Sequence, residues 1–188
     1  MRAAFQCDLI RVATFQWSPG TNHVSFKGLY PDQPEAIYMH HPISHFAPGS
    51  FLDGPAPTGT TGNDARYHFL CNVQTWYNQK TAEILRDLKT ATDAFGGSLL
   101  DHTVVPFVTE VSNAEHTRTN KPALIFGGSK LGMRGGQYLN LTARPYNDLW
   151  LTLAQAYFGT TTPLDQLSVV RFNAACASVI PGLWAPPA

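Results

Sequence analysis

The fold is decided by the stretch TVVPFVT at residues 103–109, a short and almost wholly apolar run. Such a run is typical of a buried strand, although Pro106 removes one backbone hydrogen-bond donor. A second apolar run, PALIF at residues 122–126, predicts another short buried strand that ends at a glycine pair. Glu110 follows the first run directly. It therefore lies at the carboxyl end of the predicted strand, where α/β sheets gather their chemistry.

Helices are predicted before and after these strands. Between residues 64 and 92, apolar side chains recur at three- and four-residue steps, as on an amphipathic helix with one buried stripe. A second helix is predicted from Pro145 to its stop at Gly159. Residues 9–17 predict a further strand because they are rich in β-branched and aromatic side chains. Residues 137–141 predict an edge strand.

The order strand, helix, strand, strand, helix predicts an α/β fold. We expect residues 1–159 to form this domain, with a long irregular loop over residues 19–62 that is rich in proline and glycine. Residues 160–188 form a C-terminal extension with weak signals. Residues 127–136 are rich in glycine and predict a tight connection, with anion contact by Lys130 or Arg134 as the alternative. His102 precedes the predicted strand at residues 103–109 and is interpreted as structural.

Composition narrows the function classes. The 188 residues carry a net charge of +0 and only 14% charged side chains, against about 25% in a typical soluble domain. This neutral balance argues against nucleic acid or an anionic membrane as the main partner. No apolar stretch approaches the roughly 18–20 residues that span a bilayer, and no signal peptide is visible. The cysteines are far apart and are expected to be buried small hydrophobes: Cys7, Cys71 and Cys176.

The densest cluster of chemically capable side chains is HHPISH at residues 40–45, inside the long loop. Neutral imidazole is the commonest protein metal ligand, and His41 and His45 are close enough to converge on one ion. The alternative is a surface patch of histidines with no ligand. Spacing alone does not separate these two interpretations.

A second cluster follows the predicted strand at residues 103–109. Glu110 and His116 could be a pair of metal ligands, an acid/base pair, or members of an ordinary solvated loop. Asn113, Asn120 and Lys121 could donate hydrogen bonds to an anionic substrate oxygen. Taken alone, the cluster leaves all of these alternatives open.

Nine short motifs, in this order, carry a family resemblance. They are DLIRVAT (8–14), HPISH (41–45), WYN (76–78), LRDLK (85–89), GSLLDHTVV (97–105), EVSNAEH (110–116), NKP (120–122), GG (127–128) and PYNDL (145–149). Together they resemble the C-terminal half of the bacterial DUF1552, or HXXSHH-motif, proteins. That uncharacterised family is similar to DUF1501 and is grouped with the alkaline phosphatase and sulfatase superfamily of metal-dependent hydrolases.

The resemblance implies an α/β/α sandwich like the alkaline phosphatase-like fold, in a partial version. It joins the two clusters into one divalent-metal site for zinc, calcium or magnesium, with the ligands His41, His45, Glu110 and His116. The implied substrate is a phosphate or sulfate ester, either a small molecule or a glycan. We expect the substrate to contact His40, Asn113, Asn120 and Lys121.

Two departures from the family pattern bear on activity. The family motif ends in two consecutive histidines, whereas Phe46 stands at the last position here. Full-length members also carry an N-terminal portion with an export signal, which would supply further ligands and the nucleophile. The resemblance therefore predicts either a hydrolase that works with a missing N-terminal segment or an inactive remnant, located in the periplasm or outside the cell. The alternative is a non-enzymatic exported or surface protein that binds a partner or assembles into a homo-oligomer.

Overall fold

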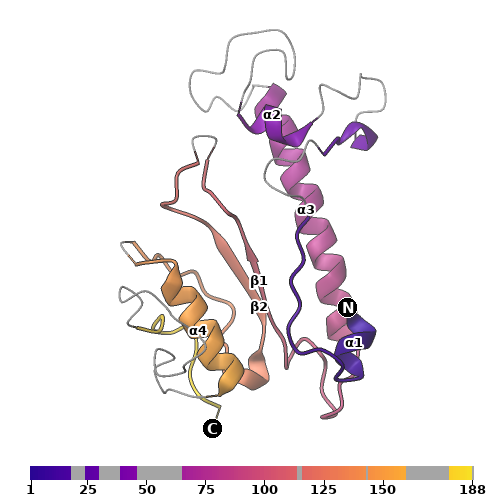
Figure 1. Ribbon diagram of the computed structural model, residues 1–188, viewed down its shortest axis with the longest axis vertical. Helices are drawn as coiled ribbons and strands as arrows, with labels where there is room; N and C mark the ends of the chain where they lie inside the picture. The colour runs from indigo at the N-terminus through magenta and orange to yellow at the C-terminus, as the bar shows by residue number, and fades with distance from the viewer. Residues whose placement is uncertain are drawn as a thin grey trace. The chain divides into compact units, whose positions relative to one another are not determined.

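The computed structural model describes residues 1–17, 24–29, 39–45, 65–113, 116–142, 144–159 and 178–187 (Figure 1). These residues form a mixed α/β structure. Its elements are α1 (Arg2–Gln6), η1 (Lys27–Leu29), α2 (His40–Ser44), α3 (Ala65–Thr90), β1 (Val104–Val108), β2 (Ala123–Gly127), η3 (Ser129–Leu131) and α4 (Asn147–Phe158).

The chain divides into two compact units, which are described separately. The first unit comprises Met1–Arg11, Leu85–Val108 and Ala123–Ala188. The second unit comprises Val12–Ile84 and Thr109–Pro122. Helix α3 therefore supplies residues to both units.

The periodicity of α3 is confirmed, and it explains why this segment is a helix. Val73 and Leu88 on the predicted apolar stripe are buried, and Ala91 just beyond the helix is buried as well. Charged side chains flank this stripe, including the ion pair between Lys80 and Glu83 at 2.9 Å. Burial of one stripe, rather than local propensity, supplies most of a helix's stability in a folded protein.

Strands β1 and β2 confirm the two predicted strands but not their expected environment. They pair antiparallel in a two-stranded sheet, with Val104 opposite Gly127 and Val108 opposite Ala123. β1 is only half-buried, and β2 begins exposed. Because no further strand pairs with either of these two among the described residues, Pro106 is tolerated in the middle of β1.

Two predicted strands are wrong. Residues 9–17 are irregular, and Leu9, Val12 and Phe15 are exposed. A β-rich sequence needs a neighbouring strand, and no strand pairs with this segment in the described residues. Residues 137–141 are also irregular. There the Gln137 side chain donates hydrogen bonds to the carbonyls of Arg134 and Gly182, which ties it into a loop.

Two other expectations also change. The described parts of the 19–62 loop contain two short helices, η1 and α2, instead of irregular chain alone. Cys7 and Cys71 are exposed free thiols, so their predicted burial is wrong, and Cys176 lies outside the described residues. No helix in the described ranges combines the length and apolar character that a bilayer crossing requires.

Helix α4 and the C-terminal segment form the core of the first unit. The predicted helix is confirmed, and it stops at Gly159, whose φ is +62°. Residues 178–187 run beside α4 (Figure 1). They insert Ile180, Leu183 and Trp184 into a buried cluster with Met133 and Leu149.

The Thr152 hydroxyl joins α4 to the C-terminal segment. The side chain is fully buried, donates to the Asp148 carbonyl at 2.7 Å and accepts from the Ile180 N–H at 2.8 Å. We expect Thr152→Val to lower the free energy of unfolding by about 1–3 kcal/mol, because a buried N–H loses its acceptor. Urea unfolding measures this loss. Thr75→Val is the matched control, since its exposed hydroxyl donates only to a helical carbonyl; an equal loss in both variants would contradict the prediction.

Candidate metal centre

Helix α2 of the second unit is fixed by one buried side chain and two backbone contacts. Ile43 is fully buried in a cluster with Phe26, Phe69 and Val73. The His40 N–H donates to the Val24 carbonyl at 3.0 Å, and Met39 forms a β-bridge with Ser25. These contacts hold the short helix although it has only five residues.

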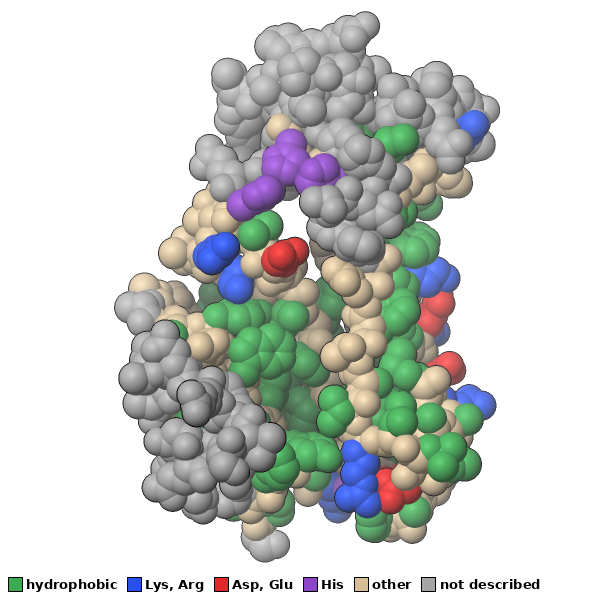
Figure 2. Space-filling model, in the orientation of Figure 1, with side chains coloured by type: hydrophobic (Ala, Val, Ile, Leu, Met, Phe, Trp, Pro, Cys, Tyr) green, Lys and Arg blue, Asp and Glu red, His purple; other side chains and the backbone are tan. Residues whose placement is uncertain are grey.

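His41 and His45 lie one helical turn apart, so their side chains leave the same side of α2. Their ring centroids are 4.7 Å apart. His116, from the Thr109–Pro122 segment of the same unit, lies against His45 with a centroid separation of 4.8 Å. Figure 2 shows histidine side chains as one continuous patch on the surface.

The closest contact in this cluster joins the Nε2 atoms of His45 and His116, which are 3.1 Å apart. Zinc lies about 2.0–2.1 Å from each imidazole nitrogen that binds it. One ion at that distance from both Nε2 atoms would see them about 100° apart, near the tetrahedral angle. Without an ion, the same separation is a hydrogen bond in which one ring donates and the other accepts.

The cluster of His41, His45 and His116 is a linked row of rings, not a closed cage. In the described part of the chain, no three His, Cys, Asp or Glu side chains form a group that could hold a metal ion as they stand. The Nε2 separation of His45 and His116 matches two ligands of one ion. His41 adjoins this pair through its ring contact with His45. Imidazole donors suit zinc or copper, while calcium and magnesium prefer oxygen ligands.

His40 lies on a different side of α2 from this row. Its ring packs against Phe26 and Tyr77, with centroids 6.2 and 6.1 Å away. Burial lowers the pKa of His40, and the neighbouring charge of His41 lowers it further. The ring is therefore neutral at pH 7 and belongs to the aromatic packing of α2 on α3.

The remaining predicted site residues lie in the Thr109–Pro122 segment. Glu110 is exposed, and no hydrogen bond or ion pair joins it to the three histidines among the described residues. Asn113 accepts a hydrogen bond from the Thr117 N–H at 3.0 Å, so it holds a turn. Asn120 is exposed with a φ of +55°, and Lys121 is half-buried.

Sequence comparison identifies no relative of this protein. No family model, curated protein or solved structure matches the chain. The resemblance to the DUF1552 proteins, with the fold and activity it implies, therefore stays a prediction. The geometry of the histidines is the observation that indicates a function.

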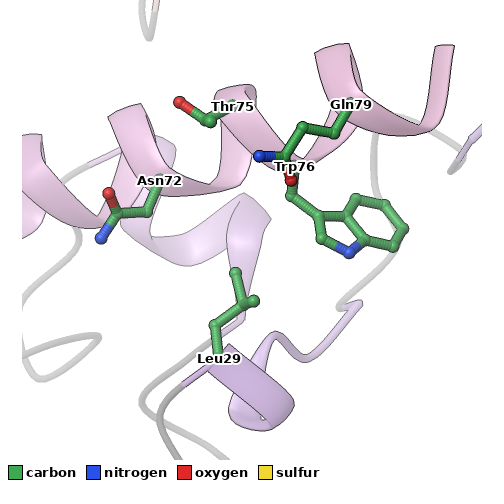
Figure 3. Close-up of a pocket in the computed structure, with 5 residues that line it drawn as sticks. All are labelled: Leu29, Asn72, Thr75, Trp76 and Gln79. Atoms are coloured by element: carbon green, nitrogen blue, oxygen red, sulfur yellow. The ribbon is translucent and has the colours of Figure 1, made fainter. Parts of the chain in front are cut away.

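The second unit also has a shallow pocket that the sequence did not indicate (Figure 3). Its volume is about 220 Å³, and it lies between η1 and α3. None of the three histidines lines it. The residues around it are Leu29, Asn72, Thr75, Trp76 and Gln79.

The interpretation of His102 as structural agrees with its contacts. Its Nδ1 meets the buried carboxylate of Asp93, which also accepts from the N–H groups of Phe95 and Gly97. Burial raises the pKa of Asp93, but these backbone hydrogen bonds and His102 together outweigh it and lower the pKa. The pair closes the turn between α3 and β1.

Proposed function

We infer that this chain binds a divalent transition metal ion through His45 and His116, with His41 as a third ligand. The observation that carries the proposal is the 3.1 Å separation of two Nε2 atoms that belong to residues 71 positions apart. Two imidazole nitrogens bound to one zinc ion would have about this separation. The row of three adjacent imidazoles supports it.

The donor set makes zinc the expected ion, in preference to the calcium or magnesium that the family resemblance also allows. Glu110 is left out of the proposed ligands because its exposed side chain is not joined to the histidines. His40 is left out of the proposed substrate contacts because its ring packs against Phe26 and Tyr77. Asn120 and Lys121 remain proposed contacts, since they belong to the same loop as His116.

The activity proposed for a metal-loaded site is hydrolysis of a phosphate or sulfate ester, as the resemblance implies. A bound zinc ion would supply Lewis acidity at an ester oxygen. The chain's own contribution is to hold two imidazoles at fixed spacing and to offer the Lys121 ammonium to an anionic ester. The nucleophile is not among these residues. The second outcome of the test is therefore an inactive remnant that still binds metal.

Zinc titration of the full chain tests the proposal. We expect one zinc per chain by isothermal calorimetry, and stabilisation by about 2.7 kcal/mol when free zinc is 100 times its Kd. His45→Ala and His116→Ala should each abolish this binding. His102→Ala is the control, because it removes a histidine that pairs with Asp93 instead.

Two results would contradict the metal site. One is a wild-type chain that binds no zinc. The other is equal zinc affinity in His116→Ala and His102→Ala. Assays with aryl phosphate and aryl sulfate then decide the activity: zinc-dependent turnover that His116→Ala abolishes supports a hydrolase, and zinc binding without turnover supports the remnant.

A further inference from the structure

The backbone of His116 is in an unusual conformation. Its φ is +58°, in the left-handed region that side chains with a Cβ rarely adopt. A residue keeps such a conformation only where its surroundings hold it there, and these residues gather at functional sites. The direction of the His116 ring depends on this conformation, because φ sets where the Cα–Cβ bond points.

A small network of hydrogen bonds encloses His116. The His116 N–H donates to the Asn113 carbonyl at 3.1 Å. The next N–H along, that of Thr117, donates to Asn113 Oδ1 at 3.0 Å. Ser112 closes the loop, since its N–H and its hydroxyl both donate to the Thr117 carbonyl, each at 2.9 Å.

We propose that Asn113 is a positioning residue, which holds His116 so that its Nε2 meets that of His45. The proposal rests on the metal site inferred above. Asn113 is the residue that contacts both the N–H of His116 and the N–H that follows it. Its carbonyl would remain after any substitution, so its side-chain oxygen is the part that a variant can remove.

Because this loop is exposed, a variant in it can test the positioning of His116 separately from the folding of the second unit. Ser112, Asn113 and His116 are all exposed, and none belongs to a buried cluster. Loss of the Asn113 side chain should therefore change the position of one ring and leave the core of the second unit intact. Outer residues that orient a metal ligand typically change metal affinity about 10–100-fold.

The test compares three variants of the full chain. Asn113→Ala should weaken zinc binding about 10–100-fold and change the visible spectrum of the cobalt-substituted protein, with little change in the Tm of the metal-free chain. Asn113→Asp keeps the acceptor oxygen and should restore both affinity and spectrum. Asn140→Ala is the matched control, because Asn140 is also exposed and accepts one local hydrogen bond, from Thr142.

A second readout needs no metal. In the metal-free chain, nuclear Overhauser contacts between the rings of His45 and His116 should be present in wild type and Asn113→Asp and lost in Asn113→Ala. Contacts that persist in Asn113→Ala would overturn the positioning role, whether or not the chain binds zinc. A wild-type chain that shows these contacts but binds no zinc would overturn the metal site and leave the structural role of Asn113 supported.

Discussion

Replacing Gly132 by alanine is expected to destabilise the first unit by at least about 4 kcal/mol. Gly132 has a φ of +84°, and a Cβ there would lie 1.8 Å from the Ala185 carbonyl oxygen. That overlap is with backbone, so no side-chain rotation relieves it. The C-terminal segment must move away, which breaks the hydrogen bond from the Ala185 N–H to the Gly132 carbonyl at 3.0 Å.

The cost should extend to the buried cluster of this unit. Trp184 is buried and its Nε1 donates to the Leu131 carbonyl at 2.7 Å, so displacement of the segment exposes the ring. Hydrogen exchange at Ala185 and urea unfolding measure the two effects. We expect faster exchange at this amide and a lower unfolding midpoint.

Gly136 provides the matched control for Gly132→Ala. Its φ is +73°, but a Cβ there would meet no atom within 4 Å. Gly136→Ala therefore carries only the backbone penalty of a left-handed alanine, about 1–2 kcal/mol. Equal losses in the two variants would show that backbone conformation, not contact with Ala185, explains the need for glycine in this connection.

The helices could be predicted from the sequence because their signals are local. The stripe through Val73 and Leu88 identifies α3, and Gly159 marks the end of α4 through its left-handed conformation. Strand predictions fail more often because a strand depends on a second, pairing strand that the local sequence does not specify. Residues 9–17 have strand composition and no partner among the described residues, whereas β1 and β2 have each other.

The histidine site could be predicted only in part for a similar reason. The spacing of His41 and His45 is local, and it correctly indicates two neighbouring rings. The contact of His116 with His45 spans 71 residues and has no signature in spacing alone. The family resemblance places Glu110 in the same site, whereas its position after a strand fixes the backbone and not the direction of the side chain.

Asn113 illustrates a second limit of sequence reasoning. A loop asparagine beside possible ligands predicts a substrate contact, because its amide can donate hydrogen bonds. In the structure its Oδ1 also accepts a hydrogen bond from the Thr117 N–H, as asparagine side chains commonly do in turns. The sequence signal for this turn is the general preference of asparagine side chains for hydrogen-bonding local backbone.

The other large effect is expected from Phe69→Ala, at about 3–5 kcal/mol of unfolding free energy. Phe69 is 1% exposed and packs edge-on against Phe26, with ring centroids 6.3 Å apart. It shares its cluster with Ile43, the side chain that fixes α2. Removing the ring leaves a cavity beneath α2, and the positions of His41 and His45 depend on that helix.

Phe95→Ala makes the same chemical change at a side chain that is 83% exposed, and we expect less than about 0.5 kcal/mol there. Urea unfolding of both variants gives the difference in stability. Zinc titration of the folded Phe69→Ala chain gives the consequence for the site, and we expect weaker binding than in Phe95→Ala. One outcome would contradict this dependence: Phe69→Ala loses several kcal/mol of unfolding free energy and still binds zinc with wild-type affinity. In that case α2 would not need its buried anchor. The metal and the loop around His116 alone would then hold the contact between His45 and His116.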